Sequence, residues 1–312
     1  SRVADTNKVE LEFEASVCSG VPIIRSLKEG LIANKISKIY GIFNGTSNYI
    51  LSSMDKQNKN FDEVLFNAKK LGYAEKKPLA DLNGDDVASK LKILSSLCFN
   101  SFLNNKIYVE GIKDIDKTDI DNANKLGYKI KLLGFAELLN NKIYQRVHPT
   151  LIKKDTYVAS IDGVLNAVII DGKPVGQSII QGEGAGPAAT TSALVSDISS
   201  ILRGNIKFPF SLSNKRRKNL TFEDVNNRFF SAYLRFEVID KPGVLSNITN
   251  IFSTNKVSIK RLIQNPHKNK KISSIIIITH SSKDKSLNKI LRQVARKNYI
   301  YRKPKLIRIN NS

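Results

Sequence analysis

The sequence contains 312 residues, 41% of them hydrophobic and 25% charged, which is the composition of an ordinary soluble globular protein large enough for two domains. No stretch approaches the roughly 18 consecutive apolar residues of a membrane span, and the first residues lack the apolar core of a signal peptide. Two cysteines and three histidines are too few for a disulfide framework or a typical zinc site. We therefore expect a cytoplasmic protein with reduced thiols and no membrane partner.

The chain is strongly basic, with 50 Lys and Arg against 28 Asp and Glu and a formal net charge of +22. Such a charge is typical of proteins that bind polyanions, because lysine and arginine neutralise phosphates. Here the charge is mostly lysine spread along the chain, apart from short runs at 214–219 and 267–271, without an aromatic-interleaved basic stripe. We favour a solvated lysine-rich surface over nucleic-acid binding.

The first elements expected along the chain are helices on either side of a strand. The first helix begins near Pro22 and carries Ile24, Leu27 and Leu31 on one face. Residues 36–46 alternate like a strand that ends in the turn signal Asn44-Gly45, and Thr46 or Ser47 could cap the helix directly after it. A further helix ends before Gly72, a residue typical of the C′ position, and its apolar face is Phe61, Val64, Leu65, Ala68 and Leu71.

Another helix comes after the segment 81–84, where Asp81 or Asn83 is expected to cap the first N–H groups. Acidic residues there also complement the positive end of the helix dipole. Asp86 and Lys90 are four residues apart and are therefore neighbours on one face of this helix. They lie beside its expected buried stripe, Val87, Leu91, Leu94 and Cys98.

The rest of the chain predicts two domains joined by a linker. Residues 106–201 read as short strands alternating with helices, which gives a mixed α/β (α+β) domain over residues 1–205. Residues 206–230 are polar, basic and Pro-bearing, as is typical of a linker. Residues 231–312 have the order βαββαβ of a ferredoxin-like domain.

Glu75, Asp81, Asp86 and Lys90 are the first candidates for chemistry. An Asp and a Lys one helical turn apart are usually a surface ion pair worth roughly 0.3–0.5 kcal/mol. Alternatively, the carboxylates and the lysine converge in a partly dry cleft, where a lysine can act as a general acid and polarise a carbonyl oxygen. The residues alone leave both interpretations open.

Two other stretches are weaker candidates. The glycines of GEGAG, residues 182–186, would let backbone N–H groups approach an anion, but no strand-GxGxxG-helix unit of a dinucleotide fingerprint occurs in the sequence. Residues 44–51 are either a substrate loop or simply a capped turn. His148 is expected to be structural.

Eight long segments of the chain carry a resemblance to a known family: FEASVCSGVPIIRSLKEGL (13–31), GIFNGTSNYILSSM (41–54), LGYAEKKPLADLNGDDVASKLKIL (71–94), LGYKIKLLGFA (126–136), RVHPTLI (146–152), DGVLNAV (162–168), QGEGAGPAATTSALVSDI (181–198) and YLRFEVIDKPGVL (233–245). Taken together, these segments resemble homoserine dehydrogenases. The resemblance implies a mixed-sheet catalytic and dimerisation domain and, C-terminal to it, a ferredoxin-like ACT domain. It also implies the NADPH- or NADH-dependent reduction of L-aspartate 4-semialdehyde to L-homoserine, on the route to threonine and methionine.

The resemblance implies roles for residues at matching positions. Lys90 would be the catalytic proton donor, Asp86 and Glu75 would hold the amino acid end of the substrate, and Asp81 would order the cluster. The positions that match the substrate loop are Gly45, Thr46 and Tyr73. The positions that match contacts with the cofactor, NADP or NAD, are Gly72, Glu75 and Gly184.

The segment EASVCSGV, residues 14–21, resembles the family's monovalent cation site. Glu14 and the carbonyls of Val17, Ser19 and Val21 would hold Na⁺ or K⁺, hard cations that oxygen ligands suit. Ser19 stands where Gly or Ala is usual, and Lys76-Lys77 where the family often has an acidic residue, which bears on cation and cofactor affinity. Compared with the family, the chain lacks a Rossmann domain, so we expect a truncated polypeptide with little dehydrogenase activity by itself.

The ACT-like module raises an alternative function, that of an amino-acid-sensing regulatory protein. In such modules the segment matching residues 240–245 leads into the first helix, and paired modules commonly bind an effector between them. Threonine is the effector that we expect. The resemblance further implies a homodimer or higher oligomer through the sheet of the catalytic domain, and nucleic acid is not an expected partner.

Overall fold

The computed structural model describes residues 2–103, 105–204, 208–266 and 271–310. They divide into two compact units, Ser1–Ile120, Lys131–His148 and Asp155–Glu223 in the first, and Asp121–Ile130, Pro149–Lys154 and Asp224–Ser312 in the second. The mixed α/β class is confirmed, whereas the expected domain boundaries stay a prediction. Most of the basic run at 267–271 and the first two residues of the expected linker lie outside the described residues.

The helices and strands alternate in mixed order along the chain. In sequence they are α1 (Arg2–Asn7), η1 (Glu14–Ser16), α2 (Ile23–Arg25), η2 (Ser26–Gly30), β1 (Lys35–Ile42), α3 (Gly45–Gln57), α4 (Phe61–Lys70), α5 (Leu79–Asn83), α6 (Asp85–Cys98), β2 (Tyr108–Val109), α7 (Lys117–Lys125), β3 (Tyr128–Leu139), β4 (Lys142–Lys153), α8 (Tyr157–Ser160), β5 (Leu165–Lys173), β6 (Gly176–Glu183), α9 (Pro187–Arg203), η3 (Asn214–Arg216), β7 (Thr221–Phe222), η4 (Val225–Asn227), β8 (Phe229–Ile239), α10 (Val244–Thr254), β9 (Ile259–Pro266), β10 (Ile272–Thr279), β11 (Ser282–Lys283), α11 (Asp284–Ala295) and β12 (Ile300–Ile309). Within the described part of the chain, no helix is both long and apolar enough to cross a membrane.

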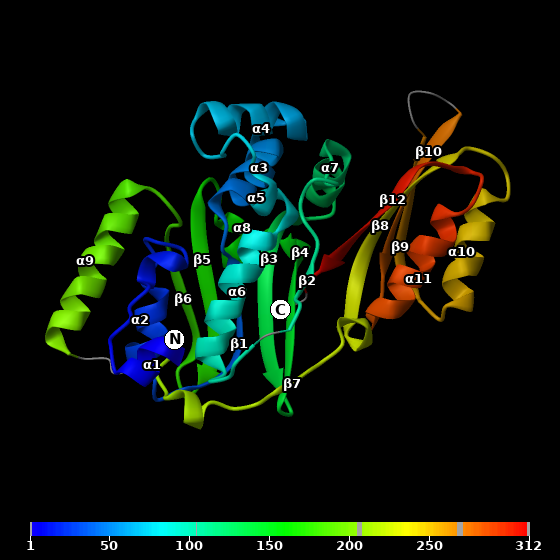
Figure 1. Ribbon diagram of the computed structural model, residues 1–312. Coiled ribbons are helices and arrows are strands. Elements are labelled where there is room, and N and C mark those ends of the chain that lie inside the picture. Colours follow the sequence, from blue (N-terminus) through cyan, green and yellow to red (C-terminus); the bar gives the residue numbers. More distant parts are fainter. Residues whose placement is uncertain (1, 104, 205–207, 267–270, 311–312) are drawn as a thin grey trace. The chain divides into compact units, whose positions relative to one another are not determined.

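The first unit is built on a sheet with the strand order β6-β5-β1-β3-β4 (Figure 1). β1 pairs antiparallel with β5 on one side and β3 on the other, so it lies inside the sheet. The expectation of short strands over residues 106–201 was wrong, because β3 and β4 have 12 residues each. Asn140 and Asn141 join them in the left-handed conformation that suits a tight hairpin turn, and the apolar pattern runs along both strands.

Helix α6 contacts β1 in this unit (Figure 1). Its expected stripe, Val87, Leu91, Leu94 and Cys98, is buried as predicted. Gly72 comes just after α4 at a φ of +77°, the left-handed C′ conformation that favours glycine. The helix expected after Pro22 is also present, as α2 continued by one turn of π-helix, η2.

The capping predictions for α3 and α6 were wrong. α3 begins after Asn44, whose side chain accepts a hydrogen bond from the Ser47 N–H, so neither Thr46 nor Ser47 is the N-cap. α6 begins after Gly84, which has a φ of +88° and no side chain to cap with. The reason is that Asp81 and Asn83 belong to the short helix α5 that directly precedes it.

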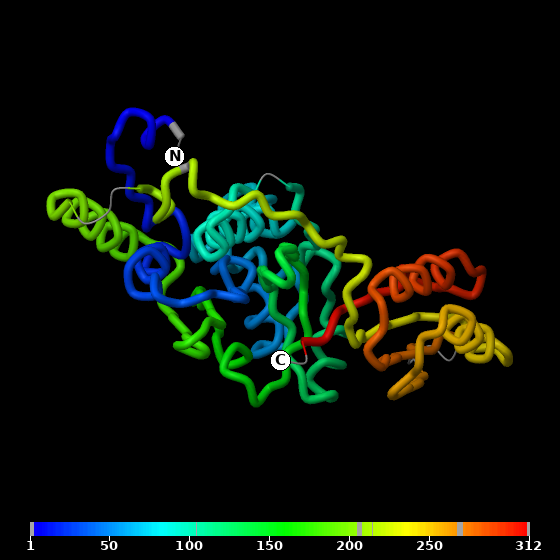
Figure 2. Tube along the Cα trace, turned by 90° about the horizontal axis from the view of Figure 1, so that it is seen from below, coloured from blue at the N-terminus to red at the C-terminus, as the bar shows by residue number. Residues whose placement is uncertain are grey.

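Helix α9 begins after the glycine-rich stretch, as predicted, with Gly186 at its N-cap. Figures 1 and 2 show it beside the first turns of the chain, and Arg25 donates hydrogen bonds to Ser196 of this helix. The Glu14 N–H donates to Asp197 Oδ2 at 3.0 Å. The segment that resembles a cation site therefore packs on α9.

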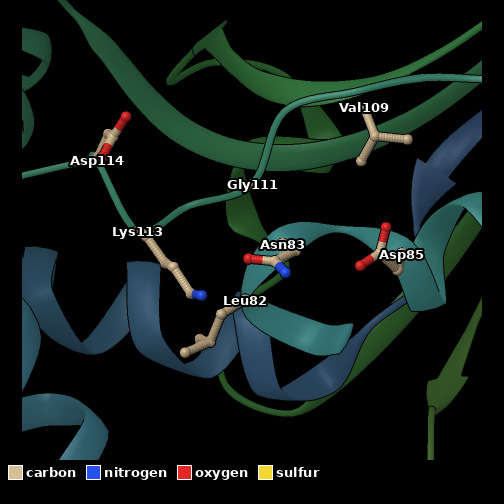
Figure 3. Close-up of a pocket in the computed structure, with 7 residues that line it drawn as sticks. All are labelled: Leu82, Asn83, Asp85, Val109, Gly111, Lys113 and Asp114. Carbon is tan, nitrogen blue, oxygen red and sulfur yellow. The ribbon is translucent and has the colours of Figure 1, made fainter. Parts of the chain in front are cut away.

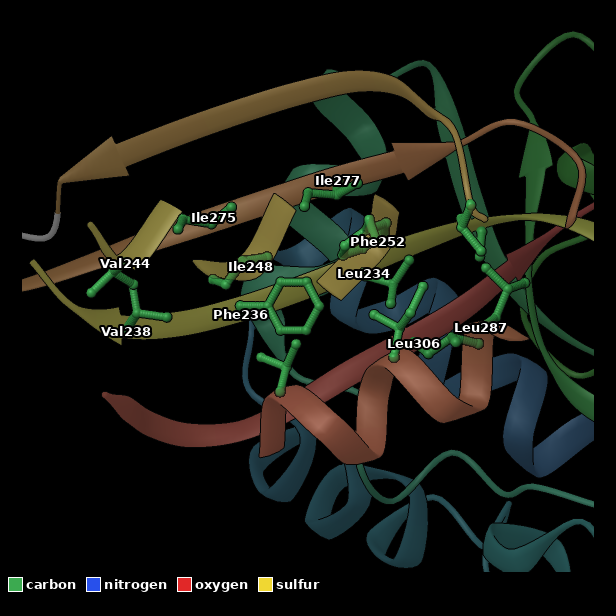
Figure 4. Close-up of a cluster of buried hydrophobic side chains, with 14 residues drawn as sticks. Leu234, Phe236, Val238, Val244, Ile248, Phe252, Ile275, Ile277, Leu287 and Leu306 are labelled. Atoms are coloured by element: carbon green, nitrogen blue, oxygen red, sulfur yellow. The ribbon is translucent and has the colours of Figure 1, made fainter. Parts of the chain in front are cut away.

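The second unit confirms the order βαββαβ through β8, α10, β9, β10, α11 and β12. Its strand order is β12-β8-β10-β9, with the short β11 also paired to β8, and α10 and α11 cover one face of the sheet (Figure 1). Between helices and sheet lies one buried apolar cluster (Figure 4): Ala232, Leu234, Phe236, Val238, Val244, Ile248, Phe252, Val257, Ile275, Ile277, Leu287, Ile290, Val294 and Leu306.

Candidate active site

Lys90, in the second turn of α6, holds its ammonium nitrogen between two oxygens. Nζ lies 2.8 Å from Asp86 Oδ2 and 2.9 Å from the carbonyl oxygen of Phe43, the residue just after β1. The side chains of Lys90 and Asp86 are 18% and 28% exposed, so the pair is neither open to solvent nor sealed from it. Because an ammonium has three N–H donors, the two contacts leave one for a ligand.

Asn44 joins the two carboxylates of the Lys90 cluster, which consists of Asp81, Asp86 and Lys90. Its Nδ2 donates to Asp81 Oδ1 at 2.7 Å and to Asp86 Oδ2 at 2.8 Å, while its Oδ1 accepts the Ser47 N–H at 2.8 Å. The ends of α3, α5 and α6 therefore meet at one buried amide. Sequence reasoning gave Asn44 only as part of a turn, although an Asn between a strand and a helix is a preferred N-cap.

Asp81 lies in the drier part of the cluster. Burial raises the pKa of its carboxyl above the ordinary 3.8, the hydrogen bond from Asn44 opposes this, and the nearby Asp86 carboxylate adds to it. The backbone is also tied down, since Ser47 Oγ donates to the Asp81 carbonyl at 2.8 Å. Asp81, Asp86 and Lys90 thus share one half-dry environment.

The expected substrate-loop residues adjoin each other on α3 and the loop after α4. Thr46 Oγ1 donates to the carbonyl of Tyr73 at 2.7 Å, and the Tyr73 ring lies 4.9 Å from that of Tyr49. Gly45 lies close to the Val164 carbonyl, because a Cβ there would come within 2.7 Å of that oxygen. A side chain at position 45 would displace the loop.

The three residues expected to contact the cofactor do not lie together. Gly72 and Glu75 are exposed on the loop after α4, and no hydrogen bond or ion pair among the described residues joins Glu75 to Lys90. Gly184 is buried, and a Cβ there would lie 2.2–2.4 Å from the side-chain atoms of Asn166. Packing against Asn166 is by itself a sufficient reason for glycine at position 184.

Both cysteines are free and buried. Cys18 Sγ lies 4.0 Å from the same Phe43 carbonyl that accepts from Lys90, and burial raises the pKa of its thiol to about 11. Such a thiol is protonated at neutral pH and is a poor nucleophile. Sequence reasoning did not place Cys18 next to the Lys90 cluster.

The segment expected to hold a monovalent cation is anchored by Glu14. Its Oε1 and Oε2 accept the N–H groups of Ile24 and Arg25, each at 2.8 Å, and burial raises the pKa of its carboxyl. Each oxygen retains a lone pair, so one carboxylate and backbone carbonyls fit the oxygen preference of Na⁺ or K⁺. Within the described ranges no group of three His, Cys, Asp or Glu side chains is placed to hold a metal ion.

A cavity of about 380 Å³ lies beside the junction of α5 and α6 (Figure 3). Asp81, Asp86 and Lys90 do not line it, so it does not coincide with the Lys90 cluster. The lining residues are Leu82, Asn83, Asp85, Val109, Gly111, Lys113 and Asp114.

Comparison with known proteins gives the same family for nearly the whole chain. Residues 22–199 match the homoserine dehydrogenase family and residues 232–297 match the ACT domain. The homoserine dehydrogenase of Helicobacter pylori is 40% identical over 302 residues, which cover 96% of this chain and 71% of the relative.

Solved structures agree with the sequence comparison. A homoserine dehydrogenase from Thiobacillus denitrificans is 37% identical with a TM-score of 0.90, covering 98% of this chain and 72% of that one. A hyperthermophilic archaeal homoserine dehydrogenase mutant in complex with NADPH is 28% identical with a TM-score of 0.54, covering 63% of this chain and 56% of that one. The family match, which extends over more than half of the chain, and these relatives show that the chain belongs to the homoserine dehydrogenase family.

Proposed function

We propose that this chain carries the substrate-binding and proton-donating part of a homoserine dehydrogenase, which reduces L-aspartate 4-semialdehyde to L-homoserine on the route to threonine and methionine. The observation that carries the proposal is the placement of Lys90. Its ammonium is held at 2.8 Å by Asp86 and at 2.9 Å by the Phe43 carbonyl. One N–H donor is left for the aldehyde oxygen.

Lys90 acts on the oxygen of the reacting carbonyl. When bound, a nicotinamide cofactor, NADPH or NADH, would supply the hydride that reduces the aldehyde carbon. As negative charge develops on the oxygen, the Lys90 N–H stabilises it and then transfers its proton, and the amine regains a proton from solvent. Asp86 positions Lys90, while Asp86, Asp81 and the exposed Glu75 attract the α-ammonium of the substrate. Gly45, Thr46 and Tyr73 form the adjoining substrate loop.

The cofactor contacts that we propose are on the loop after α4 and at the end of β6. Gly72 and Glu75 are exposed and open to a ligand, whereas Gly184 is buried, so it contributes through its backbone. The NADPH complex of the archaeal relative supports NADP, and NAD is the other candidate. Because the sequence has no strand-GxGxxG-helix unit, we further propose that residues 1–312 alone turn over little NADPH. Strong turnover by the purified polypeptide would contradict this.

The monovalent cation site is proposed from its donor atoms. Glu14 supplies a carboxylate on a buried turn, and Val17, Ser19 and Val21 supply carbonyl oxygens. The Gly20 N–H in this turn donates to the Glu183 carbonyl at 2.9 Å. A bound Na⁺ or K⁺ would therefore restrict the movement of this turn and, through the hydrogen bond, of the end of β6 next to Gly184. A melting temperature that rises with KCl or NaCl, but not with choline chloride, would support the site.

The ACT domain is proposed to bind an amino acid effector, threonine. A cavity of about 490 Å³ lies at the loop between β8 and α10, where Asp240 and Lys241 offer both charges to an amino acid. The rest of its lining is Val238, Ile239, Pro242, Gly243, Val244, Leu245, Gln264 and Ile275. Binding of threonine to residues 1–312 by calorimetry, and its loss in Asp240→Ala, would support this function. Threonine binding is also the activity expected under the alternative function, an amino-acid-sensing regulatory protein.

Assembly, location and domain limits complete the proposal. We propose domains at 1–205 and 231–312 with a linker at 206–230, and a homodimer or higher oligomer through the sheet of the first domain. β6 has β5 as its neighbour in the strand order and Ile179 on it is 39% exposed, which supports an edge open to a second copy. Free, buried cysteines support a cytoplasmic location. Light scattering on the purified chain tests the oligomer.

Replacing Lys90 tests the proposed catalytic role. Kinetic assays use residues 1–312 joined to a dinucleotide-binding domain, and Lys90→Met is expected to lower kcat by about 10²–10⁴-fold, the usual share of a general acid. Lys92→Met, on the same helix, is the matched control and is expected to leave kcat unchanged. Lys90→Met with wild-type kcat would refute the role, and lost turnover with intact threonine binding separates catalysis from sensing.

A further inference from the structure

We propose that Lys131 of β3 positions residues 44–46, which include Gly45 and Thr46 of the proposed substrate loop, by locking the first turn of α3 onto the segment 161–165. Lys131 is not among the residues of the Lys90 cluster. The inference rests on the dehydrogenase function proposed above, because the loop matters only where a substrate binds. Lys131 is a positioning residue, and it acts through Asn48.

The Lys131 ammonium is buried with its acceptors around it. The side chain is 1% exposed, and Nζ lies 3.0 Å from Asn48 Oδ1 and 2.8 Å from Asp162 Oδ1, with the Ile161 carbonyl as a third acceptor. A buried charge is stable only when it is paired and hydrogen-bonded. The three acceptors are therefore held in place as long as Lys131 is present.

Asn48 connects this ammonium to α3 and to the 161–165 segment. While its Oδ1 faces Lys131, its Nδ2 donates to the Ile161 and Leu165 carbonyls at 3.2 Å and 3.1 Å. Since an amide oxygen only accepts and an amide nitrogen only donates, Lys131 fixes which way the amide is turned. Asn48 is also one turn after Asn44, whose carbonyl accepts the Asn48 N–H at 3.2 Å.

The same segment lies directly against the substrate loop. The Gly163 N–H donates to Ser52 Oγ at 3.0 Å, and the Val164 carbonyl is so near Gly45 that a Cβ there would come within 2.7 Å of it. A shift of residues 161–165 therefore changes the position of Gly45, and with it the neighbouring Thr46. A misplacement of about 1 Å in such a loop can cost up to about 100-fold in rate.

Lys56 provides a matched control. Its Nζ lies 3.1 Å from the other oxygen of Asp162, but its side chain is 63% exposed. Lys56→Met removes a cation from the same carboxylate without touching Asn48 or the 161–165 carbonyls. Differences between Lys131→Met and Lys56→Met therefore report the buried contacts.

Hydrogen exchange on residues 1–312 tests the proposal without any turnover. Lys131→Met is expected to speed exchange of the amides of residues 45–48 and 163–165 by about 10-fold, with the amides of α9 unchanged. Lys56→Met is expected to match wild type. Wild-type exchange in Lys131→Met, or an equal rise throughout the first unit, would overturn the proposal. If Lys131→Met does not fold, Asp162→Asn carries the test, with a smaller rise at the same amides.

Kinetics of the joined enzyme add a readout that a purely structural role would not move. Lys131→Met is expected to raise KM for the semialdehyde about 10-fold while the pH profile of kcat stays as in wild type, and Lys131→Arg to restore part of the loss. An unchanged KM would overturn the positioning role. If the wild-type enzyme is inactive toward the semialdehyde, the proposed function fails, and the exchange result still decides whether Lys131 holds the loop.

Discussion

Replacing Asn44 would remove the amide that holds the acidic cluster together. Asn44→Ala loses the N-cap of α3, worth about 1 kcal/mol, and two hydrogen bonds to the Asp81 and Asp86 carboxylates at 2.7 and 2.8 Å. A hydrogen bond to a charged group contributes about 1.5–3 kcal/mol when buried. The Asp86 bond is worth less here, because the same oxygen retains Lys90 at 2.8 Å. We expect a total loss of about 2–4 kcal/mol in the free energy of unfolding.

Two further variants separate the cap from the carboxylate contacts. Asn44→Asp keeps an N-cap oxygen but sets a third carboxylate against Asp81 and Asp86, so it is expected to be less stable than Asn44→Ala at pH 7 and to recover in acid. Asn60→Ala is the control, because Asn60 occupies the N-cap of α4 without a side-chain cap bond. It is expected to change stability by less than about 0.5 kcal/mol.

Urea unfolding measured by far-UV circular dichroism at pH 7 and pH 5 compares all three variants. The reasoning fails if Asn44→Ala costs no more than Asn60→Ala, because the amide would then contribute nothing beyond an exposed cap. It also fails if Asn44→Asp is as stable as wild type at pH 7. In that case the two carboxylates would not share the dry environment that the distances and the raised pKa of Asp81 indicate.

Asp81, Gly184 and Cys18 each give one further prediction. The pKa of Asp81 in the folded protein lies above the ordinary 3.8, so between these two pKa values the folded state binds a proton that the unfolded state has lost. Ionising Asp81 therefore lowers the free energy of unfolding. This loss is absent below the unfolded pKa and complete above the folded pKa. The stability of Asp81→Asn relative to wild type should therefore improve as the pH rises above about 4 in urea titrations, and an unchanged difference across the titration would contradict the raised pKa of Asp81. Gly184→Ala should cost about 1–3 kcal/mol by overpacking against Asn166, and adding Asn166→Ala should return part of it, which thermal unfolding of the two variants decides; an additive double variant would contradict the contact. In Cys98→Ala, which leaves Cys18 as the remaining cysteine, the thiol, with a pKa of about 11, should react with Ellman's reagent at the rate of unfolding at pH 7.5, and rapid labelling of the native variant would show that the Cys18 thiol is accessible.

Local patterns predicted those parts of the fold that local contacts determine. The stripe from Val87 to Cys98 and the order βαββαβ result from periods of 3.6 and 2, and both are present. Helix caps and strand lengths were harder to predict from the sequence, because they depend on whether the neighbouring residues already belong to another helix or strand. Asp81 does not cap α6, because it lies inside the preceding helix α5. The strands β3 and β4 are joined by the two-residue turn Asn140-Asn141, so together they form a hairpin longer than the short strands that the sequence pattern predicts.

In the candidate site, too, contacts between residues close in sequence could be predicted, whereas contacts between distant residues could not. Asp81, Asp86 and Lys90 lie within one short stretch of the sequence, 81–90, from which their proximity could be predicted. Asn44, the N-cap of α3, and Lys131 of β3 lie outside that stretch. Their contacts, with Asp81 and Asp86 for Asn44 and with Asn48 and Asp162 for Lys131, join residues far apart in the sequence. The Lys90 contact with the Phe43 carbonyl spans 47 positions. No spacing rule along one helix can reveal such a contact.

The Phe43 carbonyl also bears on the choice between a surface ion pair and a catalytic lysine. An exposed pair one turn apart needs only its own helix and is worth roughly 0.3–0.5 kcal/mol. Here the lysine contacts, besides Asp86, the carbonyl oxygen of the buried residue Phe43, and its carboxylate partner is held by the 6% exposed Asn44. Two acceptors from different segments thereby fix the direction of the Lys90 ammonium, at a cost in side-chain entropy. This fixed direction is what the proton-donating role proposed for Lys90 requires, and the Lys90→Met assay decides between the two interpretations.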